Sequence, residues 1–317
     1  MMRVMRSWEA VADYPEVQGG AITIGNFDGV HLGHQQVLAE LDGHARAVEG
    51  PANLVTFEPH PRAVLFPEEA PRRLCLLHDR LSLIRDAGVH STLVLPFDKA
   101  LAQWSAETFT RKLHQAFGFK HMHVGYDFAF GRDRQGHSAM LRELGESLHF
   151  TVSEANAFEL HGGVVSSSRI RSLIEAADFA SAEALLGRPY EVSGHVCKGE
   201  QRGRTMGFPT ANLETEHLVH PPAGIYAVWA GMPEADGTVR YLPAVAYLGY
   251  RPTFQGRSLI LETHVLDQTL DLYHHRLIVR FVRRIREDRT FKHADALARQ
   301  IRKDCDAARQ CLTAAPI

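Results

Sequence analysis

The stretch 22-ITIGNFDGVHLGHQQVL-38 decides the fold of the first half of the chain. A short apolar, strand-like run at 22–24 breaks into glycines and two histidines, and a helical pattern then begins. A glycine-rich turn between a strand and a helix places backbone amides at a helix N-terminus, where unpaired N–H groups and the helix dipole attract phosphate. The stretch therefore predicts a phosphate-binding turn.

The two histidines of this turn are candidates for chemistry. His31 and His34 stand three positions apart at the start of the predicted helix, so their rings can share one face. Each ring can donate a hydrogen bond to phosphate oxygens that gain charge during displacement. Gly25, Gly29 and Gly33 let the backbone approach an anion closely. From the residues alone, two solvated histidines remain an alternative, whereas a zinc site is disfavoured because H-x-x-H supplies only two ligands.

Strand-like runs alternate with helical patterns through the rest of the first half. The strand-like runs are AITIG, NLVTFE, STLVLPF and HMHVGYDF, and the helical patterns cover residues 32–48, 78–87 and 105–117. Ser105 is a candidate N-cap, and Gly88 and Gly118 stand where helices should stop. This alternation predicts an open α/β sandwich, a Rossmann-like parallel sheet with helices on its faces.

In the second half, the alternation of strand-like and helical patterns stops after two short helical patterns, which end at Gly187 and Pro189. Five strand-like runs separated by turns follow: YEVSGHVCKG, GIYAVWAG, VRYLPAVAYLG, LILETHVLD and HRLIVRFV. A final helix carries one apolar face, formed by Leu297, Ile301, Cys305, Ala308 and Leu312. We therefore predict two domains, residues 1–186 and residues 187–317, the second built from antiparallel strands and a terminal helix.

Composition narrows the possible partners. The chain has 317 residues, 45% of them hydrophobic, and a net charge of -2, so it can bury a core but has no basic excess for nucleic acid or an anionic membrane. No segment approaches the roughly 20 apolar residues of a membrane span. Four cysteines without a C-x-x-C pair indicate reduced packing residues. These features predict a cytoplasmic protein with small-molecule substrates, and a monomer or weak oligomer.

Four blocks in the first half resemble a known family. GNFDGVHLGH resembles the G-x-F-D-G-x-H-x-G-H signature of nucleotidylyltransferases, and TFEPHP (56–61), GYDFAFGRDRQG (125–136) and VSSSRIR (165–171) are similar to the other blocks of bacterial FAD synthetase modules. The resemblance implies adenylyl transfer from ATP to FMN, with His31 and His34 as catalytic residues. The ATP-binding residues that it implies are Gly25, Asn26, Phe27, Asp28, Gly29, His31, Gly33, His34, Ser166, Ser167, Ser168, Arg169 and Arg171. The implied flavin-binding residues are Phe57, Pro59, His60, Pro61, Asp127 and Phe128.

Residue chemistry is compatible with these roles but does not require them. Hydroxyls followed by Arg169 and Arg171 are suited to binding a triphosphate. Taken alone, SSSRIR also indicates a helix cap with a solvated basic face. Phe128 and Phe130 can offer aromatic surface to an isoalloxazine ring, or they can belong to a sheet core.

A second signature lies in GEQRGRTMGFPTANL, residues 199–213. It is not a P-loop, because no lysine follows its glycines. It resembles the G-x-x-x-G-R-T-x-G-F-P-T-A-N signature of riboflavin kinases, whose core is a small antiparallel barrel. The kinase ATP-binding residues that the resemblance implies are Gly199, Gly203, Arg204, Thr205, Gly207, Phe208, Pro209, Thr210 and Asn212. Thr210 and Asn212 are also the implied Mg²⁺ ligands, and a hydroxyl and a carboxamide oxygen suit that ion.

Glu262 is the candidate base for phosphorylation. It interrupts an apolar strand-like run, where burial would raise its pKa toward a useful range, although a lone strand glutamate usually faces solvent. The match of this strand to the glutamate-bearing strand of riboflavin kinases implies the catalytic role. His264, on the same face, is interpreted as a pocket wall. Tyr247 and Tyr250 stand where the family has asparagine and a small residue, which leaves the efficiency of the kinase half open.

The resemblance covers nearly the whole chain and implies a bifunctional, Mg²⁺- and ATP-dependent transferase of flavin cofactor biosynthesis. Such an enzyme phosphorylates riboflavin to FMN and adenylates FMN to FAD with release of pyrophosphate, and it needs no nucleic-acid or membrane partner. Two alternatives stay open: an FMN adenylyltransferase whose barrel binds flavin but is impaired as a kinase, and a non-enzymatic flavin-binding regulator. An aminoacyl ligase with a similar H-x-G-H element is disfavoured, because the chain lacks a companion lysine loop.

Overall fold

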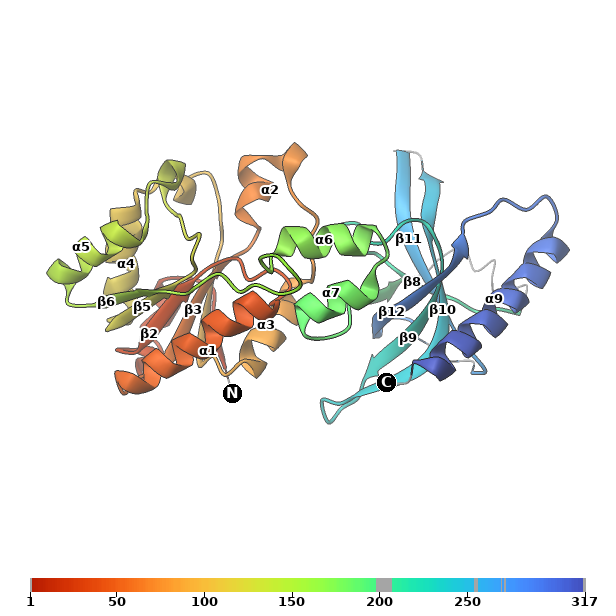
Figure 1. Cartoon of the computed structure of the whole chain (residues 1–317), viewed down its shortest axis with the longest axis horizontal. Coiled ribbons are helices and arrows are strands. Elements are labelled where there is room, and N and C mark those ends of the chain that lie inside the picture. Colours follow the sequence, from red (N-terminus) through yellow and green to blue (C-terminus); the bar gives the residue numbers. More distant parts are fainter. Residues whose placement is uncertain (1, 198–206, 254–255, 269, 271, 316–317) are drawn as a thin grey trace. The chain divides into compact units, whose positions relative to one another are not determined.

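The chain forms two compact units, which are described one at a time (Figure 1). The computed structural model describes residues 2–197, 207–253, 256–268, 270 and 272–315. Contacts group Met1–Pro71 with Leu77–Ser167 in the first unit and Arg72–Leu76 with Ser168–Ile317 in the second. Each unit has a hydrophobic core of its own.

The first unit is built on a six-stranded parallel sheet with the order β1-β4-β3-β2-β5-β6. Its strands are β1 (Arg3–Met5), β2 (Ala21–Ile24), β3 (Ala52–Phe57), β4 (Ser91–Leu95), β5 (His121–Val124) and β6 (Thr151–Glu154). The predicted parallel sheet is confirmed. The short edge strands β1 and β6 were not predicted, because neither carries a recognisable apolar run.

Helices cover both faces of this sheet. They are α1 (Leu32–Ala47), α2 (Pro61–Leu65), α3 (Leu77–Asp86), α4 (Ala106–Phe117) and α5 (Ser138–Leu148), and the 3₁₀ turns are η1 (Glu9–Val11), η2 (Pro15–Val17), η3 (Pro67–Glu69), η4 (Leu101–Gln103) and η5 (Arg132–Arg134). Successive strand residues point to opposite faces. Ile22 therefore packs with α4 and α5 in one core cluster, whereas its neighbour Ala21 packs with α1 and α3 in the other.

Strand order explains where the first unit can bind a ligand. From β2, the chain continues through β3 and β4 on one side, and then crosses to β5 on the other side of β2. Ligands of open α/β sheets bind beyond the carboxyl ends of the strands at such a reversal. The turn after β2, residues 25–31, lies at this point.

The second unit is a closed antiparallel barrel with the order β10-β11-β8-β7-β12-β9. Its strands are β7 (Glu191–Cys197), β8 (Ala211–Leu213), β9 (Gly224–Pro233), β10 (Val239–Thr253), β11 (Gly256–Val265) and β12 (Arg276–Glu287). The predicted antiparallel barrel is confirmed. It has one strand more than the five runs counted in the sequence, because the Ala-Asn-Leu end of the signature loop itself forms β8.

Among the residues that the structure describes, three helices are grouped with the barrel. They are α6 (Ser167–Glu175), all but its first residue, α7 (Phe179–Leu186) and the terminal helix α9 (Ala294–Ala314). Phe179 of α7 stacks on Phe281 of β12 at 5.4 Å between ring centroids. By contacts, the second unit therefore begins near residue 168, whereas the sequence boundary was predicted between residues 186 and 187.

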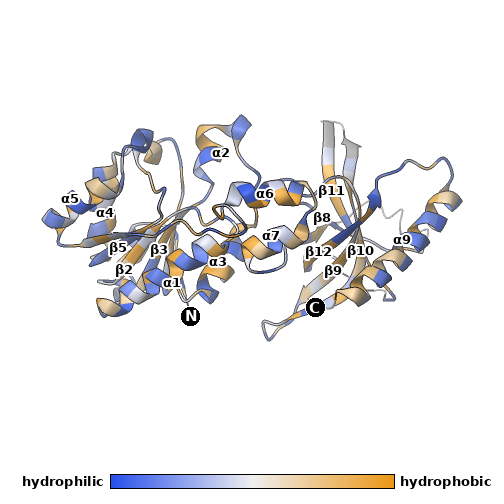
Figure 2. Ribbon diagram, viewed as in Figure 1, coloured by the Kyte–Doolittle hydropathy of each residue, from blue (hydrophilic) through white to orange (hydrophobic). Residues whose placement is uncertain are grey.

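The terminal helix has the apolar face that the sequence predicts. Figure 2 shows hydrophobic and hydrophilic residues alternating along α9. Cys305, Ala308 and Leu312 are buried, and this helix packs against β9, β10 and β12. Within the described part of the chain, no helix is long and apolar enough to cross a membrane.

Candidate functional site

The turn between β2 and α1 has an unusual backbone. Phe27 and Val30 have φ values of +50° and +38°, and Gly29 between them has +77°. A left-handed conformation is costly for a β-branched residue such as Val30 and persists only where surrounding contacts impose it. Here the Asn26 carbonyl accepts hydrogen bonds from Thr56 Oγ1 (3.3 Å) and Arg80 Nη1 (2.9 Å). The turn is thus held rigidly beside the sheet.

His31 and His34 are brought together as the sequence predicts. Their rings stack with centroids 3.7 Å apart and an angle of 15° between the planes. His31 is the N-cap of α1, and its Nδ1 accepts the backbone N–H of His34 at 3.3 Å. Since Nδ1 serves as an acceptor, neutral His31 carries its proton on Nε2. The cap therefore fixes which ring atom can donate to a ligand.

His34 is neutral at physiological pH. Burial is the main cause that lowers its pKa well below the ordinary value, and the neighbouring His31 and Arg80 lower it further. Its Nδ1 is shielded from solvent and has no hydrogen-bond partner among the described residues. An added Cβ at Gly33 would lie 3.3 Å from His31 Nδ1, so glycine leaves room for the stacked pair. The arrangement offers two close donors without two positive charges.

The predicted serine and arginine block, residues 166–171, is divided between the two units. Ser167 Oγ donates to the Asp28 carbonyl at 3.1 Å, and Asp28 itself is buried. Ser168, Arg169 and Arg171 follow on α6, which is grouped with the second unit. There Arg171 Nε donates to the Arg72 carbonyl at 2.7 Å.

The predicted flavin residues lie beyond the carboxyl ends of β3 and β5. Phe57 and Phe128 belong to one row of rings. Centroid distances along the row are 6.2 Å from Phe57 to Phe109, 6.0 Å from Phe109 to Phe130, and 5.0 Å from Phe130 to Phe128. Asp127 beside the row is exposed. The row forms a partly exposed aromatic surface above the core.

The other predicted flavin residues form the loop that leaves β3. The Glu58–Pro59 peptide bond is cis, and Pro59 is exposed. His60 is the N-cap of α2, where its Nδ1 accepts the backbone N–H of Arg62 at 3.2 Å, and Pro61 is the first residue of the helix. This loop starts from Phe57 and so lies at the same sheet edge as the aromatic row.

Arg80 is a site residue that sequence reasoning missed. It is buried on α3 and donates to the Phe57 carbonyl at 3.2 Å and to the Glu58 carboxylate at 3.1 Å, as well as to Asn26. One guanidinium thus joins the turn after β2 to the end of β3. An arginine on an amphipathic helix gives no sequence signal for this role, because the contact depends on how the strands end.

In the barrel, strand register brings together the two principal kinase candidates. Glu262 of β11 is directly opposite Asn212 of β8 and, on its other side, Tyr247 of β10. Directly paired residues of antiparallel strands present their side chains on the same face. Glu262 is half-buried, so the expected deep burial of this carboxylate is not observed. Asn212 Oδ1 is buried and has no hydrogen-bond partner among the described residues.

Tyr247, which stands where the family has asparagine, has a defined place. Its hydroxyl donates to the Asp288 carboxylate at 3.1 Å. A Cβ added at Gly249 would lie 2.1 Å from the Tyr247 hydroxyl oxygen, so the ring occupies the space above that glycine. Tyr250 is exposed.

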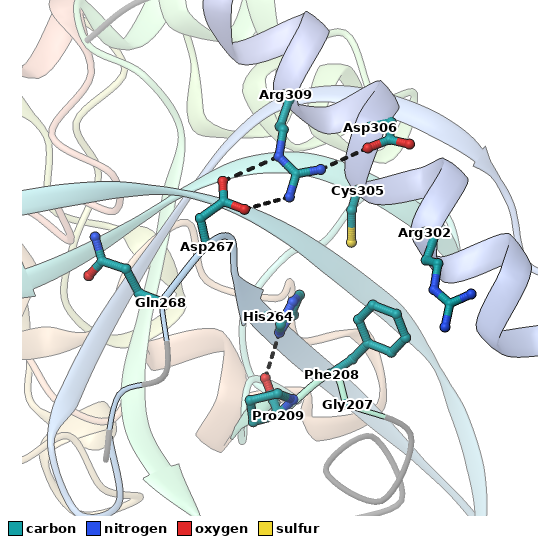
Figure 3. A pocket seen from close by; sticks show the side chains of 10 residues that line it. All are labelled: Gly207, Phe208, Pro209, His264, Asp267, Gln268, Arg302, Cys305, Asp306 and Arg309. Atoms are coloured by element: carbon teal, nitrogen blue, oxygen red, sulfur yellow. Dashed lines mark hydrogen bonds and ion pairs between the residues drawn. The ribbon is translucent and has the colours of Figure 1, made fainter.

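A cavity of about 400 Å³ opens at the end of the kinase signature (Figure 3). Gly207, Phe208 and Pro209 line one side, and α9 lines the other with Arg302, Cys305 and Arg309. His264 is also a wall of this cavity, with its Nδ1 2.8 Å from the Pro209 carbonyl oxygen and its ring edge-on to Phe208.

Ion pairs fix the far side of the cavity. Arg309 is held there by Asp267, at 2.6 Å, and by Asp306, at 2.8 Å. Thr210, beside the cavity-lining Pro209, is half-buried. Four other residues of the predicted kinase ATP set fall outside the described residues: Gly199, Gly203, Arg204 and Thr205.

Comparison with known proteins finds one family model in each half of the chain. The FAD synthetase family model matches residues 14–169, and the riboflavin kinase family model matches residues 186–312. A bifunctional riboflavin kinase/FMN adenylyltransferase of Pseudomonas fluorescens is 42% identical over 93% of this chain and 94% of its own length. The protein of the same name from Escherichia coli K12 is 36% identical over 98% of this chain and 97% of its own length.

The fold is also seen in a solved structure. A crystal structure from Streptococcus pneumoniae, described as a macrolide-efflux protein, covers 97% of this chain and 99% of its own, with a TM-score of 0.82 and 27% identity. With both family models matched in order and relatives aligned almost end to end, the chain belongs to the family of bifunctional riboflavin kinase/FMN adenylyltransferases.

Proposed function

We propose that the two reactions of this family take place at the two sites described above, adenylyl transfer in the sandwich and phosphorylation in the barrel. The chain is a transferase that phosphorylates riboflavin to FMN with ATP and adenylates FMN to FAD with release of pyrophosphate. Riboflavin, ATP, FMN and FAD are therefore its substrates and products. The stacked imidazole pair at the N-terminus of α1 is the observation that carries the assignment.

In adenylyl transfer, an oxygen of the FMN phosphate attacks the α-phosphorus of ATP, and the bond to the β-phosphate breaks. His31 Nε2 donates a hydrogen bond to a phosphate oxygen that gains charge, because its Nδ1 is engaged as the helix cap. His34 works beside it as a neutral donor. The amides of the turn from Gly25 to Gly33 and the hydroxyls of Ser166 and Ser167 bind the remaining ATP phosphates. Positioning and charge stabilisation suffice, so no covalent enzyme intermediate is required.

The flavin of this first reaction lies on the aromatic row. Stacking of an isoalloxazine ring requires exposed aromatic surface with a polar neighbour to orient it. Phe57 and Phe128 provide the surface, and Asp127 and His60 provide polar groups at its edge. Arg80 keeps the ends of β2 and β3 in register with one another and so sets the distance between flavin and nucleotide.

In phosphorylation, the riboflavin hydroxyl attacks the γ-phosphorus of ATP, and ADP leaves. Glu262 accepts the hydroxyl proton. The cavity beside Phe208 and Pro209, with arginines on its far wall, supports ATP binding next to the signature residues.

The barrel also has a donor set that fits a hard cation. Asn212 Oδ1 is a buried carboxamide oxygen that no described residue hydrogen-bonds, and the Thr210 hydroxyl is two positions away. Oxygen ligands of this kind suit Mg²⁺, which usually takes few protein ligands together with phosphate oxygens and waters. When bound, the ion neutralises charge on the transferred phosphoryl group. Glu262, directly opposite Asn212 in the strand pairing, is the residue that we assign to accept the proton.

The cellular setting follows from the substrates. We propose that the enzyme works in the cytoplasm, where ATP is supplied, as a monomer or weak oligomer without nucleic-acid or membrane partners. The small net charge of -2 supports this, because such partners select strongly charged surfaces.

Separation of the two reactions tests the assignment. The double variant His31→Ala/His34→Ala is expected to lose FAD formation while FMN accumulates from riboflavin, ATP and Mg²⁺. Glu262→Gln is expected to block riboflavin phosphorylation and to leave FAD formation from supplied FMN unchanged. Chromatographic product analysis distinguishes these outcomes. Loss of both activities in either folded variant would contradict the two-site assignment, and absence of FMN formation by the unchanged chain would favour a kinase-impaired barrel.

A further inference from the structure

A cluster of three histidines lies in the first unit, away from the imidazole pair. His44 comes from α1, and His121 and His123 come from β5. One ring nitrogen of each lies within 4.8 Å of the others, and within the described ranges of the chain this is the one group with such potential metal-ligand spacing. His34 and His44 are ten positions apart on α1, about 15 Å at the rise of an α-helix. The cluster is therefore distinct from the site of adenylyl transfer.

Secondary structure explains why these side chains converge. His121 and His123 alternate with buried Met122, so both point to the sheet face that α1 covers. Glu40 and His44 are four positions apart and share the helix face that meets them. Parallel pairing sets His123 beside Ser153 of β6. Helix and strand periodicities thus direct three imidazoles and a carboxylate to one point.

The three rings are aimed at a single place, which the Ser153 hydroxyl marks. Its Oγ lies 2.7 Å from His121 Nε2, 2.7 Å from His123 Nδ1 and 3.0 Å from His44 Nε2. A hydroxyl donates one hydrogen bond and accepts up to two, so Ser153 can contact all three nitrogens at once. The geometry thus directs three ring nitrogens to one point.

Outer contacts select the tautomers that present those lone pairs. His121 Nδ1 lies 2.6 Å from Thr151 Oγ1, and His123 Nε2 lies 3.0 Å from Glu40 Oε2. A carboxylate facing Nε2 favours the proton on that atom, so the lone pair of His123 is on Nδ1, which faces Ser153. The other oxygen of Glu40 is fixed by Gln36 at 2.7 Å. Carboxylate and hydroxyl partners on the outer nitrogen are the usual support of metal-binding histidines.

Exposure differs across the cluster. The His123 side chain is 1% exposed, whereas that of Glu40 is 37% exposed.

We propose that His44, His121 and His123 form a binding site for a divalent transition-metal ion, Zn²⁺ by its ligand chemistry, separate from both reaction centres. Three imidazoles suit Zn²⁺ and disfavour Mg²⁺ or Ca²⁺, which prefer oxygen ligands. Glu40 is a positioning residue that orients His123. A bound ion joins α1 to β5 and stabilises the first unit. This proposal does not depend on which reaction the first unit performs.

Metal titration of the full-length chain tests the proposal. The protein is stripped with chelator and titrated with Zn²⁺ by calorimetry and with Co²⁺ by visible spectroscopy. We expect one high-affinity ion per chain, Co²⁺ absorption typical of four-coordination, and a higher Tm with Zn²⁺. His44→Gln, at a half-exposed helix position, should weaken binding by more than about tenfold, and Glu40→Gln by about tenfold.

Two controls keep the result interpretable. His78→Gln removes an exposed imidazole outside the cluster and should bind Zn²⁺ like the unchanged chain. His31→Ala/His34→Ala should also retain the ion, which excludes the imidazole pair as the site. The proposal is overturned if no high-affinity ion binds, if folded His44→Gln binds it normally, or if the His31/His34 variant loses it. In each of these cases the cluster is a hydrogen-bonded contact between helix and sheet.

Discussion

His31 has two separate tasks, one structural and one chemical. Its Nδ1 caps α1, and its Nε2 is the proposed phosphate donor. Asparagine is also a good N-cap, whereas alanine is not. The two tasks can therefore be separated by substitution.

We expect His31→Asn and His31→Ala to lose FAD formation to a similar extent, about 10²- to 10³-fold, because both remove the donor. The free energy of unfolding should be about 1 kcal/mol higher for His31→Asn than for His31→Ala, because the asparagine side chain still caps α1. Initial rates with supplied FMN and urea unfolding measure the two effects. Equal stability of the variants would contradict the capping role, and a near-normal rate in His31→Asn would contradict the catalytic role.

His114, on α4, makes the stability of the protein depend on pH. Its ring packs edge-on against Phe119 at 5.0 Å, and burial is the main cause that lowers its pKa below the model-peptide value of 6.5. The unfolded chain then binds a proton near pH 6.5 that the folded chain does not bind until lower pH. Stability is therefore complete above pH 6.5 and decreases as the pH falls below it.

We expect His114→Gln to reduce this acid sensitivity, since glutamine does not titrate. Urea unfolding of both proteins at several pH values between 7 and 5 measures it. The slope of unfolding free energy against pH should be smaller in the variant. An unchanged slope would show that other groups cause the acid sensitivity.

Among the elements, those with strong periodicity were predictable and the short ones were not. The helix at 105–117 was correctly bounded, because Ser105 caps it through the Thr108 N–H and Gly118 ends it in a left-handed conformation. In contrast, β8 has three residues and follows a glycine- and proline-containing segment. This strand forms because β7 and β11 pair with it on either side. The local sequence does not predict that pairing.

The terminal helix is anchored by a buried ion pair. Asp304 on α9 accepts from both Arg286 Nε at 2.9 Å and Arg286 Nη2 at 2.8 Å, and its side chain is 4% exposed. On the same helix, Asp306 pairs with Arg309 but is 70% exposed. Removing one partner of a buried pair leaves an uncompensated charge, whereas an exposed pair contributes little.

We therefore expect Asp304→Ala to lower the unfolding free energy of the barrel by about 3–5 kcal/mol. The matched control Asp306→Ala should change it by no more than about 1 kcal/mol. Thermal unfolding and hydrogen exchange of α9 amides measure both. Similar effects of the two substitutions would contradict the anchoring role of Asp304.

For the whole molecule, the motifs predicted both folds, because each resembles a family with one known architecture. The boundary predicted between residues 186 and 187 stays a prediction, since contacts group α6 and α7 with the barrel. The VSSSRIR block that opens α6 resembles the FAD synthetase family, yet α6 is grouped with the barrel. Helix α7 contacts the barrel through Phe179, whose partners Tyr226 and Phe281 are far away in the sequence. Arg80 escaped prediction for the same reason, since its role depends on strand ends that only the folded sheet brings together.

Phe179 tests whether α7 is structurally part of the barrel. We expect Phe179→Ala to destabilise the barrel by about 3–5 kcal/mol, the usual cost of removing a buried phenyl ring. Hydrogen exchange of β9 and β12 amides in the whole chain measures this loss. Phe66→Ala, which removes a ring that is 54% exposed, is the control and should leave these amides unchanged. Normal protection in Phe179→Ala would support the join predicted near residue 187.

The three-residue length of β8 makes the barrel unequally tolerant of changes in chain length. One additional residue between Thr210 and Asn212 would turn the carboxamide to the opposite side of the barrel wall, away from Glu262. The same addition at Gly237, in the exposed hairpin between β9 and β10, would only enlarge a loop. Natural variation in length should therefore be frequent at this hairpin and absent from β8.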